Sequence, residues 1–253
     1  MNLIIKTIIF CFYSFVVLAR GQGETEITTE EGIEVFQNEK YYLLKKNVKI
    51  ESDNFTLYAD DVKINFDNNL YDITELNAKG NVDFHSQEYK MKGFGDFLKF
   101  EVKIEKLKLE GAGSELITQE IEMYSDGSIE VSNLSGKFIL EGFNSKLVSE
   151  DILIKGKSIN GIFSDVSDRK EITLLKVVDE NKSYIKNNEI EMYAKKINYN
   201  NKTSIIELID DVSIIRNEEK ITGDYGTLDT TNNSYKIKSN NQNKVKVIIQ
   251  DNE

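Results

Sequence analysis

A repeated pattern of alternating apolar and polar residues runs along the chain beyond its N-terminal part. The clearest copy is residues 57–69 (LYADDVKINFDNN), in which alternation is followed by an Asn-rich turn. Residues 192–201 (MYAKKINYNN) repeat this shape, and residues 221–228 (ITGDYGTL) repeat it more weakly. A strand–turn unit of this kind cannot bury its apolar face alone, so it must stack on its neighbours. The pattern therefore predicts a stacked β surface rather than a catalytic pocket.

The apolar positions of these stretches define the dry face of the predicted sheet. A period of two is typical of antiparallel strands with one buried and one solvated face. The alternation continues through residues 100–104 (FEVKI), which predicts a strand there. These positions would line either an open groove or a closed core, because alternation looks the same in both. The residues assigned to this face are Val48, Ile50, Leu57, Ala59, Val62, Ile64, Phe66, Phe100, Val102 and Ile104.

Turns and small residues punctuate the predicted strands. The chain has no proline, which suits continuous strand ladders because every residue can then donate its N–H. Small residues recur within the strands and predict bends or bulges, at Ala59, Gly93, Ser125, Ala194 and Gly223. Short segments rich in Asn, Asp and Gly mark the expected turns, at 67–69, 126–127, 160–161, 187–188, 200–201 and 232–233.

The N-terminus has the composition of an export signal. Residues 1–21 contain Lys6, an apolar stretch and small residues suited to cleavage. The alternative is an uncleaved membrane anchor, although the apolar run of residues 8–19 is shorter than the roughly 20 residues that a spanning helix needs. Residues 22–32 predict a loose polar lead-in. The remaining residues 33–250 form either one all-β domain or two continuous modules, 33–115 and 116–250.

Composition argues against several classes of function. The net charge of −11 disfavours nucleic-acid binding, which depends on neutralising phosphates. The only cysteine, Cys11, lies within the export signal, so neither disulfides nor thiolate metal sites are expected in the exported part. The only histidine, His85, has no cluster of ligands or catalytic partners around it in sequence. We therefore predict no metal, no cofactor and no enzymatic activity.

Four lysines near the C-terminus stand out against this acidic background. They would contact either anionic phosphates or an acidic partner edge, or they would form a solvated strand face that blunts a sheet edge. The four are Lys236, Lys238, Lys244 and Lys246.

Short motifs connect the repeats with a known family. Residues 78–84 (AKGNVDF) contain a Gly-Asn-Val element, and residues 46–50 (KNVKI) followed by 57–62 (LYADDV) give a second version. Residues 211–214 (DVSI) followed by 221–225 (ITGDY) give a third. Together these residues resemble the LptA/OstA-like family of periplasmic lipopolysaccharide-transport proteins. Lys46 stands where the family usually has Gly, and the middle of the chain exceeds what a minimal member needs.

The resemblance implies a fold, a function and a location. It implies an elongated, twisted β-jelly roll shaped like an open trough, whose interior carries the acyl chains of lipopolysaccharide from the inner to the outer membrane. It also implies a periplasmic location and edge-to-edge pairing with other bridge components or with further copies of the chain. A related LptC-like member keeps an N-terminal membrane anchor. The competing hypothesis is an exported structural or adhesive β-repeat protein with a closed core and no lipid.

Overall fold

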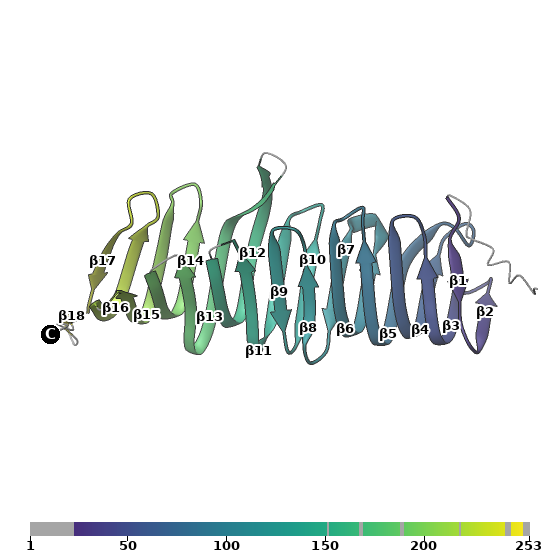
Figure 1. The fold of residues 1–253 in the computed structure, drawn as a ribbon, viewed down its shortest axis with the longest axis horizontal. Coiled ribbons are helices and arrows are strands. Elements are labelled where there is room, and N and C mark those ends of the chain that lie inside the picture. Colours follow the sequence, from purple (N-terminus) through teal and green to yellow (C-terminus); the bar gives the residue numbers. More distant parts are fainter. Residues whose placement is uncertain are drawn as a thin grey trace, which may run out of the picture.

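The protein is an elongated stack of strands that run across its long axis (Figure 1). The computed structural model describes residues 23–150, 152–166, 169–187, 190–217, 219–240 and 244–249. Within these ranges the chain forms strands and one short 3-10 helix, and the all-β prediction is confirmed. No helix of the described residues is long and apolar enough to span a membrane. The predicted signal peptide or anchor, residues 1–21, lies outside the described residues.

The strands form one antiparallel sheet, and most are hydrogen-bonded to the strands before and after them in sequence. The predicted lead-in is partly ordered, because its residues Glu26–Thr28 pair with residues 49–51. The elements are β1 (Glu26–Thr28), β2 (Gly32–Phe36), β3 (Tyr41–Glu51), β4 (Phe55–Phe66), β5 (Ile73–Ser86), β6 (Met91–Glu101), η1 (Val102–Ile104), β7 (Lys106–Glu110), β8 (Ser114–Ile117), β9 (Ile121–Ser125), β10 (Ser128–Ser132), β11 (Lys137–Ser149), β12 (Ile152–Val166), β13 (Arg169–Asn187), β14 (Ile190–Asn200), β15 (Ile205–Arg216), β16 (Glu219–Asp229), β17 (Ser234–Lys238) and β18 (Lys246–Ile249).

The long strands bend near their middle, and these bends lie beside one another along the molecule. The register shifts at the bend, for example between Tyr58 and Asp61 where β4 pairs with β5. The bends divide the sheet into two walls. Wall A contains the inward-facing Leu44 and Val62, and wall B contains the inward-facing Leu57 and Phe84.

The two walls pack against each other through bulky side chains that lie over glycines. A Cβ added at Gly93 of wall B would lie 3.0 Å from Cδ1 of Leu109 in wall A. A Cβ at Gly156 of wall B would lie only 2.5 Å from Cγ1 of Val177 in wall A. Because interiors are close-packed, glycine at these positions lets the opposite wall approach.

Most residues of the inner row next to the bends are small. In this row Ser114 pairs with Ser125, and Ser183 pairs with Ala194. Val48 and Val82 also stand in this row, and each pairs with a small residue, Ala59 or Gly95. The predicted small residues Ser125 and Ala194 thus lie next to bends. The buried hydroxyl of Ser125 donates to the carbonyl oxygen of Glu141 at 2.8 Å, so this hydroxyl has a hydrogen-bond partner at the bend.

Two local predictions are wrong. Residues 102–104 form the 3-10 helix η1 in the hairpin between β6 and β7, not a strand, and Glu105 completes the turn with a φ of 46°. Residues Asn160 and Gly161 lie inside β12 rather than in a turn. Gly161 is required there because the ring of Phe138 covers it, with Cζ 2.2 Å from where a Cβ would stand.

Candidate functional site

The interior of the N-terminal half is filled by the chain's own side chains. The predicted dry-face residues of β3 and β4 are at most 5% exposed, and they are Val48, Ile50, Leu57, Ala59, Val62, Ile64 and Phe66. Phe100 is half-buried and packs against this core. Val102 and Ile104, at 38% and 47% exposed, lie on the surface in η1. The lipid-binding role assigned to these residues stays a prediction.

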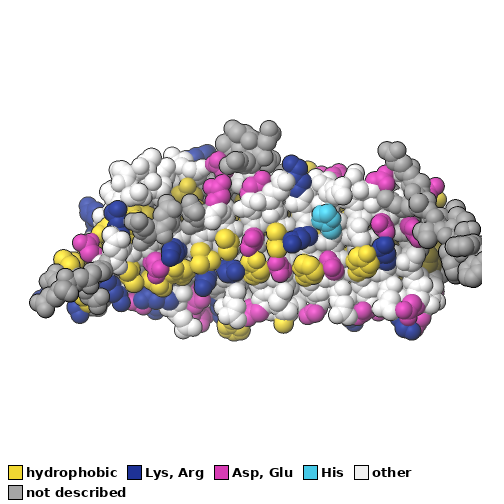
Figure 2. Space-filling view, in the orientation of Figure 1, with side chains coloured by type: hydrophobic (Ala, Val, Ile, Leu, Met, Phe, Trp, Pro, Cys, Tyr) yellow, Lys and Arg dark blue, Asp and Glu magenta, His cyan; other side chains and the backbone are white. Residues whose placement is uncertain are grey.

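The face shown in Figure 2 is mixed in character, with acidic, basic and hydrophobic side chains interspersed over it.

In the C-terminal half the two walls enclose a cavity of about 440 Å³. Wall A contributes Ile172, Leu175, Tyr199 and Ile206, and wall B contributes Ile152, Ile154 and Ile185. These side chains belong to the inward-facing rows, so the cavity is a part of the trough interior that protein atoms leave unfilled. Its rim is polar and consists of Glu120, Ser149, Glu150, Lys170, Glu171, Asn187, Asn201 and Thr230.

The rim carries more acidic than basic side chains, and two of its residues are held by hydrogen bonds to neighbouring elements. Lys170 Nζ donates to Oδ1 of Asn133 at 2.9 Å, which links β13 to the β10–β11 turn. The hydroxyl of Tyr199 donates to Oδ1 of Asn201 at 3.3 Å. Burial raises the pKa of Tyr199 above its ordinary value, so its phenol stays neutral and turns a largely apolar ring toward the cavity.

The hairpin β12–β13 builds much of this opening. Its strands are the longest in the protein, with 15 and 19 residues, and the hairpin rises above its neighbours in Figure 1. Sequence reasoning did not place the site here. The apolar run of residues 152–154 (ILI) was a usable strand signal, but only the packing reveals that the walls separate at this level.

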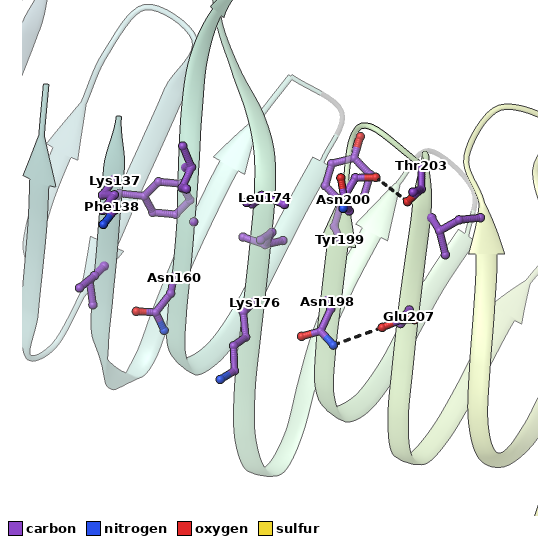
Figure 3. A pocket seen from close by; sticks show the side chains of 15 residues that line it. Lys137, Phe138, Asn160, Leu174, Lys176, Asn198, Tyr199, Asn200, Thr203 and Glu207 are labelled. Atoms are coloured by element: carbon purple, nitrogen blue, oxygen red, sulfur yellow. Dashed lines mark hydrogen bonds between the residues drawn. The ribbon is translucent and has the colours of Figure 1, made fainter. Parts of the chain in front are cut away.

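A second hollow of about 650 Å³ lies on the opposite side of wall A (Figure 3). Its lining includes the outward-facing Asn160, Lys176, Asn198 and Glu207 together with the half-exposed Leu174. Asn198 Nδ2 donates to Oε2 of Glu207 at 3.4 Å. Leu175 and Tyr199 border both hollows, so a single sheet separates the two.

The described residues contain no group of three or more His, Cys, Asp or Glu side chains arranged to hold a metal ion. His85 is exposed on β5, where it pairs in register with Thr56 and Lys92. The metal-free, cofactor-free function stays a prediction.

A family model described as "LptA/(LptD N-terminal domain) LPS transport protein" matches residues 26–158 and, separately, residues 127–234. The two matches together span most of the chain. The protein belongs to this LptA/LptD family. The family consists of lipopolysaccharide-transport proteins, which are a non-enzymatic class, and the predicted family is thus confirmed.

Other comparisons add little to the family match. A crystal structure of LptH from Pseudomonas aeruginosa, titled the LptA homologous periplasmic component of the lipopolysaccharide transport device, is similar with a TM-score of 0.44 and 14% identity. The similarity covers 53% of this chain and 96% of LptH. No curated protein sequence matches this LptA/LptD family member.

Proposed function

We propose that the protein carries lipopolysaccharide across the periplasm, from the inner toward the outer membrane, with acyl chains held between its two walls. The cavity at β12–β15 is the observation that carries this proposal, because inward-facing residues of both walls line it. Membership of the LptA/LptD family supports it.

Apolar burial would supply the binding energy. Each CH₂ group moved from water into the cavity contributes about 0.8 kcal/mol. The net charge of −11 gives no long-range attraction for an anionic lipid, and Glu120 and Glu171 stand at the rim. The headgroup therefore stays in water at the rim while the acyl chains enter between Ile152 and Ile172.

A photocrosslinker placed on either side of β13 tests this function. Benzoylphenylalanine at Ile172 would face the cavity, whereas the same group at Leu174 would face the outer hollow. In cells that make lipopolysaccharide, we expect crosslinks to lipopolysaccharide from position 172 and at least ten-fold fewer from position 174. Equal yields from both positions, or none from position 172, would contradict the proposal.

We further propose that partners extend the sheet at the two ends of the molecule. The end strands β2 and β17 each pair with one neighbour among the described residues, which leaves an outer edge. At each end two short strands stand side by side, one continuing each wall: β2 and β1 at one end, and β17 and β18 at the other. Another bridge component, or a second copy, would add strands to these edges.

The closed N-terminal half favours the competing function, an exported structural protein without lipid. Leu44, Leu57 and Leu98 are at most 1% exposed, so the chain's own side chains fill the interior there. Mass spectrometry of a solvent extract of the purified protein separates the two functions. Co-purified lipopolysaccharide supports transport, and its absence from protein made in a lipopolysaccharide-producing host supports the structural function.

A further inference from the structure

A row of exposed aromatic and acidic side chains crosses the outer face of wall B. Tyr58 on β4 pairs in register with Asp83 on β5, which pairs with Phe94 on β6. Phe94 pairs with Glu115 on β8, which pairs with Tyr124 on β9. Five neighbouring strands thus present aromatic, acid, aromatic, acid and aromatic side chains in one straight row.

The row has a lysine at each end, and its exposed members are Tyr58 and Phe94, whereas Tyr124 is half-buried. Tyr58 and Phe94 are 45% and 40% exposed. Lys49, paired with Tyr58, holds its Nζ 5.8 Å from the centre of that ring. Lys146, paired with Tyr124, holds its Nζ 3.9 Å from the centre of that ring. A broken line of hydrophobic side chains, with charged side chains between and beside them, runs along the face shown in Figure 2.

The spacing of the rings is set by the sheet. Successive aromatic residues are two strands apart, which is about 10 Å at the usual strand separation. In a linear β-1,4-linked glycan, alternate sugars face the same way, and they repeat at the length of one disaccharide, which is close to this distance. The row also runs along the long axis of the molecule, so an extended chain could lie on all three rings at once.

We propose that this row, Tyr58–Asp83–Phe94–Glu115–Tyr124, binds a linear β-1,4-linked polysaccharide. The aromatic rings stack on the C–H faces of alternate sugars, and the carboxylates of Asp83 and Glu115 accept hydrogen bonds from hydroxyl groups of the sugars between them. Hydrogen bonds to charged acceptors are stronger than neutral ones, which suits a ligand rich in hydroxyl groups.

The chemistry of the row favours a glycan over a protein or a lipid. Protein hot spots need a contiguous, desolvated apolar centre, but here a carboxylate separates each ring from the next. A lipid chain would bury Asp83 and Glu115 without hydrogen-bond partners, at a cost. The row also lies on the outside of wall B, so this inference does not depend on the acyl-chain function of the interior.

Binding to chitin, an insoluble β-1,4-linked polymer, and to soluble chitohexaose tests the proposal. We expect the mature chain to sediment with chitin and to bind chitohexaose in calorimetry. The combined variant Tyr58→Ala, Phe94→Ala, Tyr124→Ala should bind at least ten-fold more weakly. Tyr58→Phe keeps the ring and should retain binding. Tyr71→Ala, which removes a 93% exposed tyrosine away from the row, is the matched control.

Several outcomes would overturn the proposal. These are a wild-type chain that binds neither form of the glycan, a combined variant that binds as well as wild type, or ring-dependent binding of lipopolysaccharide saccharides without binding of chitohexaose. Asp83→Asn with Glu115→Gln should weaken binding while leaving the rings in place, which covers the case in which the ring variant fails to fold. Crosslinking of lipopolysaccharide from position 172 should be unchanged in these variants.

Discussion

The carboxylate of Asp60 on β4 accepts hydrogen bonds from the side-chain amide of Asn81 on β5, with Nδ2 3.0 Å from each carboxylate oxygen. Asp60 also occupies the space that a side chain at Gly80 would need, since a Cβ there would lie 2.1 Å from Oδ2. Gly80 and Asn81 both have positive φ, at 75° and 46°. The Ala59–Asp60 motif on β4 and the Gly80–Val82 motif on β5 therefore form the two sides of one bend.

The same contact, an aspartate carboxylate beside a glycine, recurs at other bends of the sheet. Asn144 Nδ2 donates to Oδ2 of Asp126 at 2.9 Å, and Gly142 lies beside that carboxylate. Gly111 packs against Asp96 in the same way. A carboxylate thus packs against a glycine of positive φ at three of the bends, which explains why these repeats are visible in the sequence.

Replacing Gly80 by Ala should destabilise the protein by about 2–4 kcal/mol, because backbone strain and a steric clash with Asp60 add together. Gly113→Ala is the matched control, since Gly113 has a φ of 82° but has no atom within 4 Å of an added Cβ. It should cost only the backbone strain, about 1–2 kcal/mol. Urea unfolding monitored by circular dichroism measures both changes. Equal losses would show that Asp60 does not shape the bend.

Truncating Leu57 to Ala should cost about 2–5 kcal/mol, as expected for a fully buried leucine. Ile64→Asp should prevent folding, because Ile64 is 1% exposed and an unpaired charge there would be buried. Ile172→Ala, at the half-buried cavity lining, should cost under about 1.5 kcal/mol by comparison. Thermal unfolding of the three variants checks this order. A folded Ile64→Asp variant would show that the N-terminal half opens readily.

Stability should fall in strongly alkaline solution in a way that depends on Tyr124. The hydrogen bond from its hydroxyl to Oε2 of Glu122, at 2.8 Å, raises the pKa of Tyr124 from its ordinary value of 10.0 to about 12, and desolvation adds to this. The folded state therefore holds the phenol proton more tightly than the unfolded state. The resulting stabilisation is complete below pH 10.0 and is lost as the pH rises through about 12.

Tyrosinate absorbance during a pH titration measures this effect. Glu122→Gln should move the ionisation of one tyrosine to lower pH, because the amide carries no negative charge. Tyr124→Phe should flatten the loss of stability in this pH range. Titration curves identical to wild type for both variants would rule out the Tyr124–Glu122 contact as the cause.

The family motif could be recognised in the sequence at a bend where an aspartate packs against a glycine. It could not be recognised where other residues replace this contact. The Asp60–Gly80 bend carries a recognisable motif, and it lies beside well-patterned strands. At β12 the corresponding position is Lys157, whose Nζ lies 3.7 Å from Oε1 of Glu180 on β13, so the signs of charge are exchanged and the motif disappears.

The candidate cavity lies in that unrecognised region. The residues that line it alternate as strands should, but alternation cannot say whether two facing walls touch or separate. That depends on the lengths of β12 and β13 and on which side chains meet across the trough, such as Val177 over Gly156. The closed interior around Leu57 was equally invisible, because a filled and an open trough have the same pattern.

The two ends of the molecule have opposite charge and matching strand direction. The edge strands at one end carry Glu26 and Glu34, whereas those at the other carry Lys236, Lys238 and Lys246. The chain passes from wall B to wall A through β1 and β2, and from wall A to wall B through β17 and β18. A second copy placed head to tail would therefore set β17 antiparallel to β2 and would continue both walls.

We expect concentration-dependent end-to-end association that weakens as salt rises, because complementary charge at the ends is screened. Lys236→Glu with Lys238→Glu should weaken self-association at least ten-fold in sedimentation velocity at low salt. Lys137→Glu, an exposed lysine in the body of the molecule, is the control and should leave association unchanged. Adding Glu26→Lys and Glu34→Lys to the double variant should restore association, because the charges are exchanged between the two ends. If neither the double variant nor the fourfold variant altered self-association, the contact would lie elsewhere on the surface.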